Sequence, residues 1–414
     1  MGIKFNILVC ALFLTFPALG VEQVPGATVQ GLLQWLEQDS AEIAAAQADT
    51  ASAMKRAESA GALPDPSVRI EWMDINRTNV LPGQAGEMRY NVLQPLPGWG
   101  KREAQKQVAV AKSVVVKEQQ REVSAELRAR VKMAFAQYYQ VHQALQLNEE
   151  LAKFTDTVAQ LAKLRYENNL VTQQDWVKAQ LEQSSLQSEH ISLQTTYSQY
   201  QARINSLLNR AAYAPLLSPA VLRSLPQTAV LNSDSLEQRL SQSSPQLAGL
   251  VAQTTVSTSN VELARKNLIP DFILGIAPVQ RGNNFSTWNA MLEFSIPLQR
   301  ASHGAHQSEA EAMLEADRDR LQGAEARLLG ELREHYAALH AAHEMEMLTH
   351  QRVMPLAELA YNGALEGYKN GRVDFATLLE AKRQIQKAHL DELNAEVEQQ
   401  IHLAEIERLI GEDL

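Results

Sequence analysis

The chain is poor in cysteine, in aromatic residues and in positive charge. Its 414 residues include one cysteine, Cys10, so a chain without its first 20 residues has no thiol to form a disulfide. Aromatic residues make up 6%, fewer than a globular core of this length normally carries, which favours long helices. A net charge of -10 does not provide the basic surface that a nucleic-acid partner needs, so we expect no nucleic acid.

The first 20 residues have the pattern of a secretory signal peptide. Lys4 precedes a short apolar run that ends before Pro17, and small residues follow at 18–20. The run is too short to span a bilayer, which takes about 20 apolar residues. A buried N-terminal helix is the alternative. We predict that residues 1–20 are a signal peptide and that the chain is an exported envelope protein.

A two-residue alternation of apolar and charged side chains interrupts the helical pattern near residue 67. The apolar positions are Val68, Ile70, Trp72, Met88, Tyr90 and Val92. They lie on either side of a loop that contains Pro82 and Gly83, so the segment 67–95 is predicted to be a β-hairpin with one apolar and one charged face. Such a hairpin belongs either to an amphipathic sheet with one solvated face or to a transmembrane barrel with a charged lumen.

The junction between this hairpin and the helix that follows it occurs twice. Residues 88–97 match residues 288–297 at a shift of 200, which places Pro97 on Pro297. The segment 63–65 matches 269–271 at a shift of 206, and Asn169 matches Gly371 at a shift of 202. Three matches in the same order predict a tandem duplication.

The duplication sets the predicted organisation of the chain. The first repeat, 21–210, is expected to contain an equatorial helix over 26–60, the β-hairpin over 67–95, and long helices over 101–166 and 173–209. A linker or equatorial segment over 211–243 leads to the second repeat, 244–414, with a helix over 245–267, a β-hairpin over 272–296, and long helices over 302–367 and 374–411. The 101–166 helix contains no proline or glycine and is on the order of 90 to 100 Å long.

Four strands cannot close a barrel, and lipid does not tolerate an open sheet edge. Two copies of the chain give eight strands and three copies give twelve, both of which close. The helices are too long and too polar for a globular core, but they suit a wall with water on both faces. These features predict an oligomeric channel that continues into a helical tube.

The chain resembles the outer-membrane efflux protein family, the TolC-like trimeric ducts of Gram-negative bacteria. The resemblance rests on Leu63-Pro64-Asp65-Pro66, on Pro97-Gly98-Trp99-Gly100-Lys101-Arg102, on Ile296-Pro297, and on Tyr368-Lys369-Asn370-Gly371. The first junction is most similar to the heavy-metal efflux branch. In the second copy Ala305 and His306 follow Gly304 where a basic residue is common, which leaves the substrate open between metal cations and small toxic compounds.

The resemblance implies a mostly α protein with a small β part, which forms a homotrimer with a twelve-stranded transmembrane β-barrel continued by a periplasmic α-barrel. It further implies an outer-membrane exit duct without cofactor or catalysis, served by a periplasmic adaptor (a membrane fusion protein) and by an inner-membrane pump expected to be proton-driven. The rival interpretations are a soluble periplasmic coiled-coil adaptor and a metal-binding protein. We expect no enzyme, since the chain has no HExxH pattern or phosphate loop.

The resemblance also assigns candidate sites. The periplasmic tip that docks the adaptor comprises Asn168, Asn169, Leu170, Val171, Asn370, Gly371, Arg372 and Val373. Candidate charges at the constriction are Glu380, Asp374 and Asp175, with Thr377 at the companion acidic position; the alternative is that they are ordinary solvated charges near a turn. The barrel-to-helix junction comprises Pro97, Gly100, Lys101 and Pro297.

Histidines provide the only metal-ligand pattern that the sequence suggests. His340, His343 and His350 fall on one face of a predicted helix together with Met347, so a soft-metal site there is a low-ranked candidate. The alternative is a wetted surface of histidines. We expect no resident metal.

Overall fold

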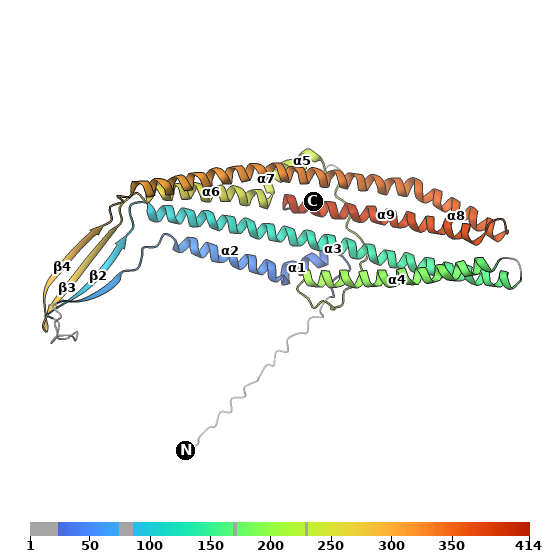
Figure 1. The fold of residues 1–414 in the computed structure, drawn as a ribbon, viewed down its shortest axis with the longest axis horizontal. Helices are drawn as coiled ribbons and strands as arrows, with labels where there is room; N and C mark the ends of the chain where they lie inside the picture. The colour runs from blue at the N-terminus through green and yellow to red at the C-terminus, as the bar shows by residue number, and fades with distance from the viewer. Residues whose placement is uncertain (1–23, 74–85, 169–171, 228–230) are drawn as a thin grey trace, which may run out of the picture.

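The structure is a computed structural model that describes residues 24–73, 86–168, 172–227 and 231–414. The predicted signal peptide with Cys10, the loop with Pro82 and Gly83, and the tip residues Asn169, Leu170 and Val171 lie outside the described residues. The molecule is strongly elongated, with a small sheet at one end and the turns of two helical hairpins at the other (Figure 1).

Helices account for most of the chain. They are α1 (Val29–Asp39), α2 (Ala41–Ser59), α3 (Lys101–Glu167), α4 (Gln173–Leu207), α5 (Ser233–Ser243), α6 (Pro245–Lys266), α7 (Arg300–Leu348), the π-helix η2 (Thr349–Val353), α8 (Met354–Lys369) and α9 (Phe375–Ile410). The 67 residues of α3 extend for about 100 Å. Among the described residues, no helix combines the length and the apolarity that crossing a membrane requires.

The long helices lie side by side in one curved layer (Figure 1). Toward the sheet the order across the layer is α7, α6, α3, α2, and toward the turns it is α7–α8, α9, α3, α4. α3 thus crosses both halves of the molecule and contacts both repeats. α7 and α8 form one long edge of the layer, and α2 and α4 form the other.

Two leucine-rich clusters hold the middle of this layer. In the first, Phe135 and Tyr138 of α3 are fully buried against α1 and α4. In the second, Leu236 and Leu240 of α5 pack against α7 and α9. The predicted linker over 211–243 is corrected here: its last part is the helix α5, because leucines four residues apart give it one apolar face.

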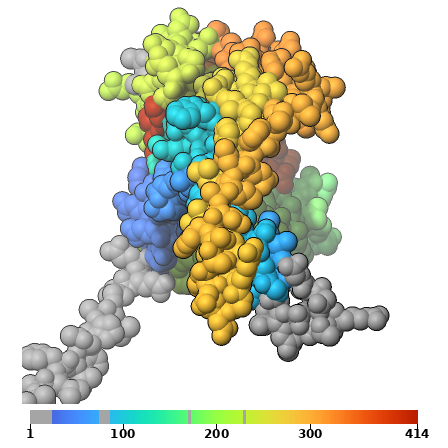
Figure 2. Space-filling view, turned by 90° about the vertical axis from the view of Figure 1, so that its left-hand side faces the viewer, coloured from blue at the N-terminus to red at the C-terminus, as the bar shows by residue number. Residues whose placement is uncertain are grey.

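The sheet has the order β1-β2-β3-β4, and all neighbours are antiparallel. The strands are β1 (Ser67–Met73), β2 (Glu87–Leu96), β3 (Phe272–Arg281) and β4 (Asn284–Phe294). The pairing of β2 with β3 joins the two repeats. In Figure 2, which looks onto the sheet end, β3 and β4 lie nearest the viewer, in front of the helices.

Two predicted helices are interrupted in the structure. The helix expected over 26–60 is divided at Ser40, whose extended backbone ends α1 and whose hydroxyl accepts the amide of Ile43 at the start of α2. The helix expected over 302–367 is divided by η2. Pro355 follows it and has no N–H to donate to the preceding turn, which accounts for the wider π-turn at this position.

Candidate functional site

One face of the sheet is apolar and exposed across all four strands. The strand register brings Val68 opposite Val92, Val92 opposite Ile276, and Leu274 opposite Leu292, so even-numbered side chains share this face. Val68 is 70% exposed and Trp288 is 72% exposed. An apolar surface that extends over four strands needs a cover of lipid or protein.

The other face carries charges that pair with one another. Glu87 accepts a hydrogen bond from Arg89 at 2.7 Å and contacts Arg281 of β3 at 3.1 Å. Small residues such as Gly275 and Ala277 occupy the same face further along β3. The sheet therefore has the two faces that a wall between an apolar medium and water requires.

The first strand-to-helix junction is fastened to the second repeat. The Lys101 ammonium donates to Asp271 at 2.8 Å, and the Gly98 amide donates to the same carboxylate at 2.7 Å. A Cβ on Gly98 would lie 2.6 Å from the carbonyl oxygen of Pro270. Gly100 has a φ of 81°, which glycine adopts without strain. Of the predicted junction residues, Gly100 allows the turn and Lys101 binds Asp271. Pro97 directly precedes Gly98, whose amide binds the same carboxylate.

The second turn lies at the end of the molecule farthest from the sheet. Gly371, with a φ of 70°, ends α8, and the amide of Arg372 donates to the carbonyl of Gly367 at 2.8 Å. Val373 packs on Gly367. Asn168 ends α3 in a similar way to Asn370, since each side-chain amide donates to the carbonyl four residues earlier.

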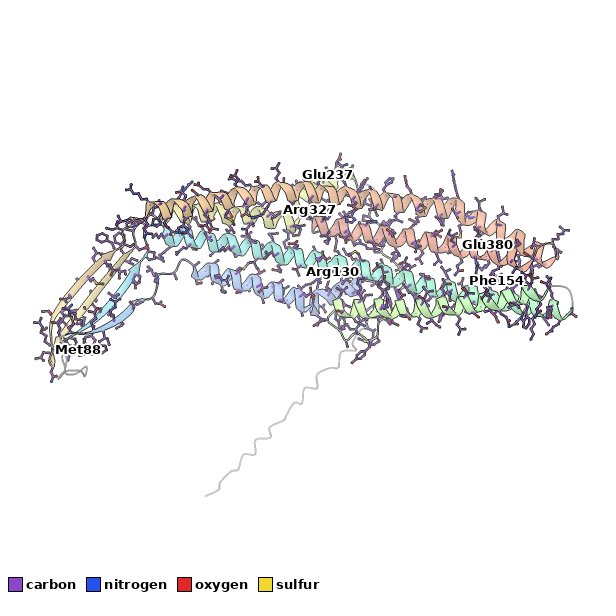
Figure 3. The ribbon with its side chains drawn as sticks, viewed as in Figure 1. Met88, Arg130, Phe154, Glu237, Arg327 and Glu380 are labelled. Atoms are coloured by element: carbon purple, nitrogen blue, oxygen red, sulfur yellow. The ribbon has the colours of Figure 1, made fainter. Side chains whose placement is uncertain are left out.

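The three predicted constriction charges have different environments. Asp374 caps α9, because its carboxylate accepts hydrogen bonds from the hydroxyl of Thr377 at 2.6 Å and from the amide of Thr377 at 2.9 Å. These hydrogen bonds lower the pKa of Asp374. Glu380, six residues further along α9, is exposed and accepts a hydrogen bond from Gln384 at 3.2 Å. Asp175 is half-buried in the first turn of α4. In Figure 3, Glu380 lies near the helical turns, at the opposite end of the molecule from Met88 in the sheet.

Contacts between the two hairpins are built just behind the turns. Tyr368 is buried, and Arg165 of α3 lies 4.7 Å above its ring and donates to its carbonyl at 3.4 Å. Arg383 of α9 forms an ion pair with the buried Glu182 of α4, with Nε 3.0 Å from Oε1. These partners lie about two hundred residues apart in the chain, so the sequence patterns did not indicate them.

The predicted histidine face does not form one site. His340 lies near Glu344, His343 contacts Gln399, and His350 contacts Glu392. Among the residues that the structure describes, no group of three or more His, Cys, Asp or Glu side chains is arranged to hold a metal ion. Two other imidazoles do come close together, since Nδ1 of His335 in α7 lies 3.2 Å from Nδ1 of His402 in α9.

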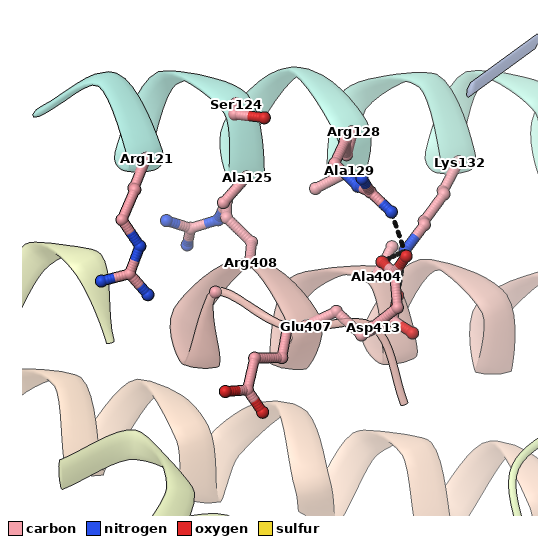
Figure 4. A pocket seen from close by; sticks show the side chains of 12 residues that line it. Arg121, Ser124, Ala125, Arg128, Ala129, Lys132, Ala404, Glu407, Arg408 and Asp413 are labelled. Carbon is pink, nitrogen blue, oxygen red and sulfur yellow. Dashed lines mark hydrogen bonds and ion pairs between the residues drawn. The ribbon is translucent and has the colours of Figure 1, made fainter. Parts of the chain in front are cut away.

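An ion cluster joins the end of the chain to the first repeat (Figure 4). Buried Lys132 donates to Glu407 at 2.7 Å and to Asp413 at 2.5 Å, and Arg128 also pairs with Asp413. Burial alone would raise the pKa of Asp413, but Lys132 and Arg128 hold it below the usual aspartate value. The cluster borders a cavity of about 360 Å³ between α3 and α9. The acidic and basic side chains of this cluster pair with one another, so we interpret the cluster as a structural contact that holds the end of α9 against α3.

These features define the wall of a channel: a two-faced sheet, whose outer strands β1 and β4 pair on one side only within the described part of the chain, continues into an open layer of helices. A family model described as outer membrane efflux protein matches residues 32–210 and 236–412. The chain belongs to the outer membrane efflux protein family.

Solved structures share this fold over nearly the whole chain. CusC matches with a TM-score of 0.80 and 16% identity, covering 94% of this chain and 93% of that one. The outer membrane protein VceC from Vibrio cholerae matches with a TM-score of 0.78 and 14% identity, covering 93% of this chain and 96% of that one. The MtrE outer membrane channel of Neisseria gonorrhoeae, in its open state, matches with a TM-score of 0.76 and 13% identity, covering 93% of this chain and 89% of that one. No curated protein sequence matches the chain.

The family and the fold confirm the main predictions. The chain is mostly helical with a small sheet, and its fold is that of TolC-like channels, a shared β-barrel continued by an α-barrel. It is a homologue of the outer-membrane channels of tripartite efflux pumps, located in the outer membrane and extending into the periplasm.

Proposed function

We propose that three copies of this chain form an exit duct that passively conducts metal cations or small toxic compounds out of the cell. A periplasmic adaptor and an inner-membrane pump, driven by protons, deliver the substrate. The observation that carries this proposal is the four-stranded sheet with one apolar and one charged face. Within the described residues its outer strands β1 and β4 each have a neighbour on one side only, and closure with further copies would satisfy their backbone in lipid. The duct itself catalyses no reaction.

Trp99 supports the orientation of the sheet in a membrane. It lies three residues after the end of β2 and two before the start of α3, and it is 91% exposed. An indole has an apolar body and a polar N–H, and such rings concentrate at the boundary between lipid and water. Trp99 would then mark the periplasmic boundary of the bilayer, with the helices on the periplasmic side of it.

The helical turns are proposed as the adaptor-docking tip, formed by Asn168, Asn169, Leu170 and Val171 from the first hairpin and by Asn370, Gly371, Arg372 and Val373 from the second. Three copies of Glu380, with Asp374 and Asp175 nearby, would surround the axis as a ring of carboxylates. Such a ring attracts cations, and its like charges repel one another when the tip narrows. Exposed Glu380 suits this role better than Asp374, whose carboxylate is engaged in capping α9.

The rival interpretation as a soluble adaptor loses its basis, since the family model for outer-membrane efflux proteins matches both repeats. Native mass spectrometry of protein extracted from outer membranes in mild detergent tests the duct directly. We expect a trimer. A monomer recovered from the soluble periplasm would overturn the proposal.

Conductance in planar bilayers tests the tip. The purified trimer should form a cation-selective pore, and Glu380→Gln should reduce the preference for cations while the trimer stays intact. Arg318→Gln, on the exposed surface of α7, serves as a control that should leave selectivity unchanged. Survival of a strain lacking the chain, challenged with metal salts or with small toxic compounds, then separates the two substrate classes.

A further inference from the structure

Two histidines from different helices face each other at the seam between α7 and α9. The Nδ1 atoms of His335 and His402 lie 3.2 Å apart, and their rings are inclined at 40° with centroids 5.4 Å apart. Both side chains are half-buried, so solvent reaches them. The residues are 67 positions apart in the chain, and only the packing of α7 on α9 brings them together.

The separation of the two nitrogens fits a shared metal ion. Imidazole nitrogens bind zinc at about 2.0–2.1 Å, and two such ligands in a tetrahedral shell lie roughly 3.3 Å apart. The observed separation of 3.2 Å matches this value closely. Without a metal, one Nδ1 must carry a proton toward the other, because two bare lone pairs at this distance repel each other.

The surroundings of His402 favour the tautomer that a metal needs. Its Nε2 lies 3.4 Å from a carboxylate oxygen of Glu398, one turn earlier on α9. A carboxylate near Nε2 favours the tautomer with its proton on Nε2, which leaves Nδ1 free to coordinate. A carboxylate beside a metal-bound histidine also recurs in zinc proteins. The nearby charges Glu405 and Arg408 are paired with each other at 2.7 Å, so Arg408 does not stand as an isolated cation beside the site.

We propose that His335 and His402 form a binding site for a divalent transition metal of the zinc, copper or nickel type, with water completing the coordination shell. Imidazole ligands select these borderline metals over magnesium or calcium. A metal held by one residue of α7 and one of α9 cross-links the edge helix of the layer to its neighbour. The site requires only the observed packing of α7 on α9 and does not rest on the proposed function or on the nature of the exported substrate.

Zinc titration of the full-length protein tests the site. After chelator treatment in mild detergent, isothermal titration calorimetry should show saturable binding of one zinc per chain. His335→Gln and His402→Gln should each weaken binding by at least about tenfold, and the double variant should be little worse than either single variant. Glu398→Gln should weaken binding by about tenfold, since outer partners of metal ligands typically contribute that much. His340→Gln, on the same helix as His335 but with its own neighbour Glu344, is the matched control and should bind as the unaltered protein does.

A second measurement keeps the proposal open to contradiction if the variants fold poorly. Electron paramagnetic resonance of the unaltered protein loaded with one equivalent of Cu²⁺ should show two coordinated imidazole nitrogens. Signals from one nitrogen or none, a lack of saturable zinc binding, or unchanged binding in His402→Gln would each overturn the proposal.

Discussion

The two strand-to-helix junctions have the same origin in the sequence but different surroundings in the structure. At the first junction Gly98 is buried, and both its amide and Lys101 are bound to Asp271 of the second repeat. At the second junction Ile296 is 61% exposed and Leu298 is 79% exposed. The first junction is closed by the other repeat, whereas the second has a surface that is still to be covered.

This difference indicates what covers the second junction. Within one chain, the first junction packs on the segment Ile269-Pro270-Asp271, which is the repeat of Leu63-Pro64-Asp65. If the repeats alternate around a closed ring, the second junction packs on residues 63–65 of the next protomer. In such a ring Leu292 of β4 lies opposite Ile70 of β1 in the neighbour, as Val92 of β2 lies opposite Ile276 of β3 within the chain. The shift of 200 places Ala301 at the position of Lys101, so the cation expected nearest to Asp65 of the next protomer is Arg300, one residue earlier. Both residues are exposed in the single chain.

The largest effect is expected from adding one methyl group to the closed junction. Gly98→Ala would bring a Cβ within 2.6 Å of the Pro270 carbonyl oxygen, which is backbone and cannot swing away. We expect a loss of about 1–3 kcal/mol in stability, as is typical of overpacking. The thermal midpoint of the purified protein, followed by circular dichroism in detergent, measures this loss.

The matched control lies just after the second junction. A Cβ added to Gly304 in α7 would meet no other atom of the chain within 4 Å, so Gly304→Ala should be neutral or stabilising by up to about 1 kcal/mol through higher helix propensity. If Gly98→Ala and Gly304→Ala destabilised the protein equally, the two junctions would be equally packed, and the difference between them described above would be wrong.

The sequence predicted most of this architecture because its signals are local. Alternation at 67–95 and 272–296, the missing proline and glycine between Lys101 and Glu167, and the repeated prolines all act over a few residues. The interruptions were missed for physical reasons: Ser40 is a single cap inside an apolar pattern, and Pro355 is carried by a π-turn without ending the helix.

The candidate sites were predicted only in part, since their partners are remote in sequence. Lys101 was placed at the junction, but its partner Asp271 is 170 residues away. The histidine pattern along one helix favoured His340, His343 and His350, whereas the close pair His335 and His402 forms across two helices. Spacing along one helix cannot show which residue of a second helix lies opposite.

A smaller effect is expected at the proposed contact between protomers. An exposed ion pair contributes up to about 1 kcal/mol, so Asp65→Arg or Arg300→Asp alone should lower the temperature at which the trimer dissociates by a few degrees at most. The two changes together should restore it, because the pair is re-formed with reversed charges. Failure of the double variant to recover would argue against this pairing.

Crosslinking tests the same contact by distance. The only cysteine, Cys10, lies in the predicted signal peptide, so Asp65→Cys with Arg300→Cys introduces the only two thiols of the mature chain. A short bifunctional maleimide should yield covalent trimers on a denaturing gel. The control pair Asp65→Cys with Arg318→Cys, several turns further along α7, should stay monomeric.

The smallest effect is expected in how the stability contributed by the Lys101–Asp271 pair depends on pH. Burial alone would raise the pKa of Asp271, but the hydrogen bonds from Lys101 and the Gly98 amide lower it below the usual value of 3.8. A lowered folded pKa means that the pair contributes stability above pH 3.8, and that this contribution is lost as the pH falls through the lowered folded value. Asp271 is half exposed, with 49% of its side chain accessible, so the contribution is at most about 1 kcal/mol. Lys101→Met should therefore lower the thermal midpoint slightly at pH 7 and by less near pH 2, because the pair loses its charge attraction as Asp271 becomes protonated below its lowered pKa. Arg300→Met at the uncovered junction of the dissociated chain should show no such dependence, and a loss from Lys101→Met that is equally large at both pH values would assign Lys101 a packing role without an electrostatic one.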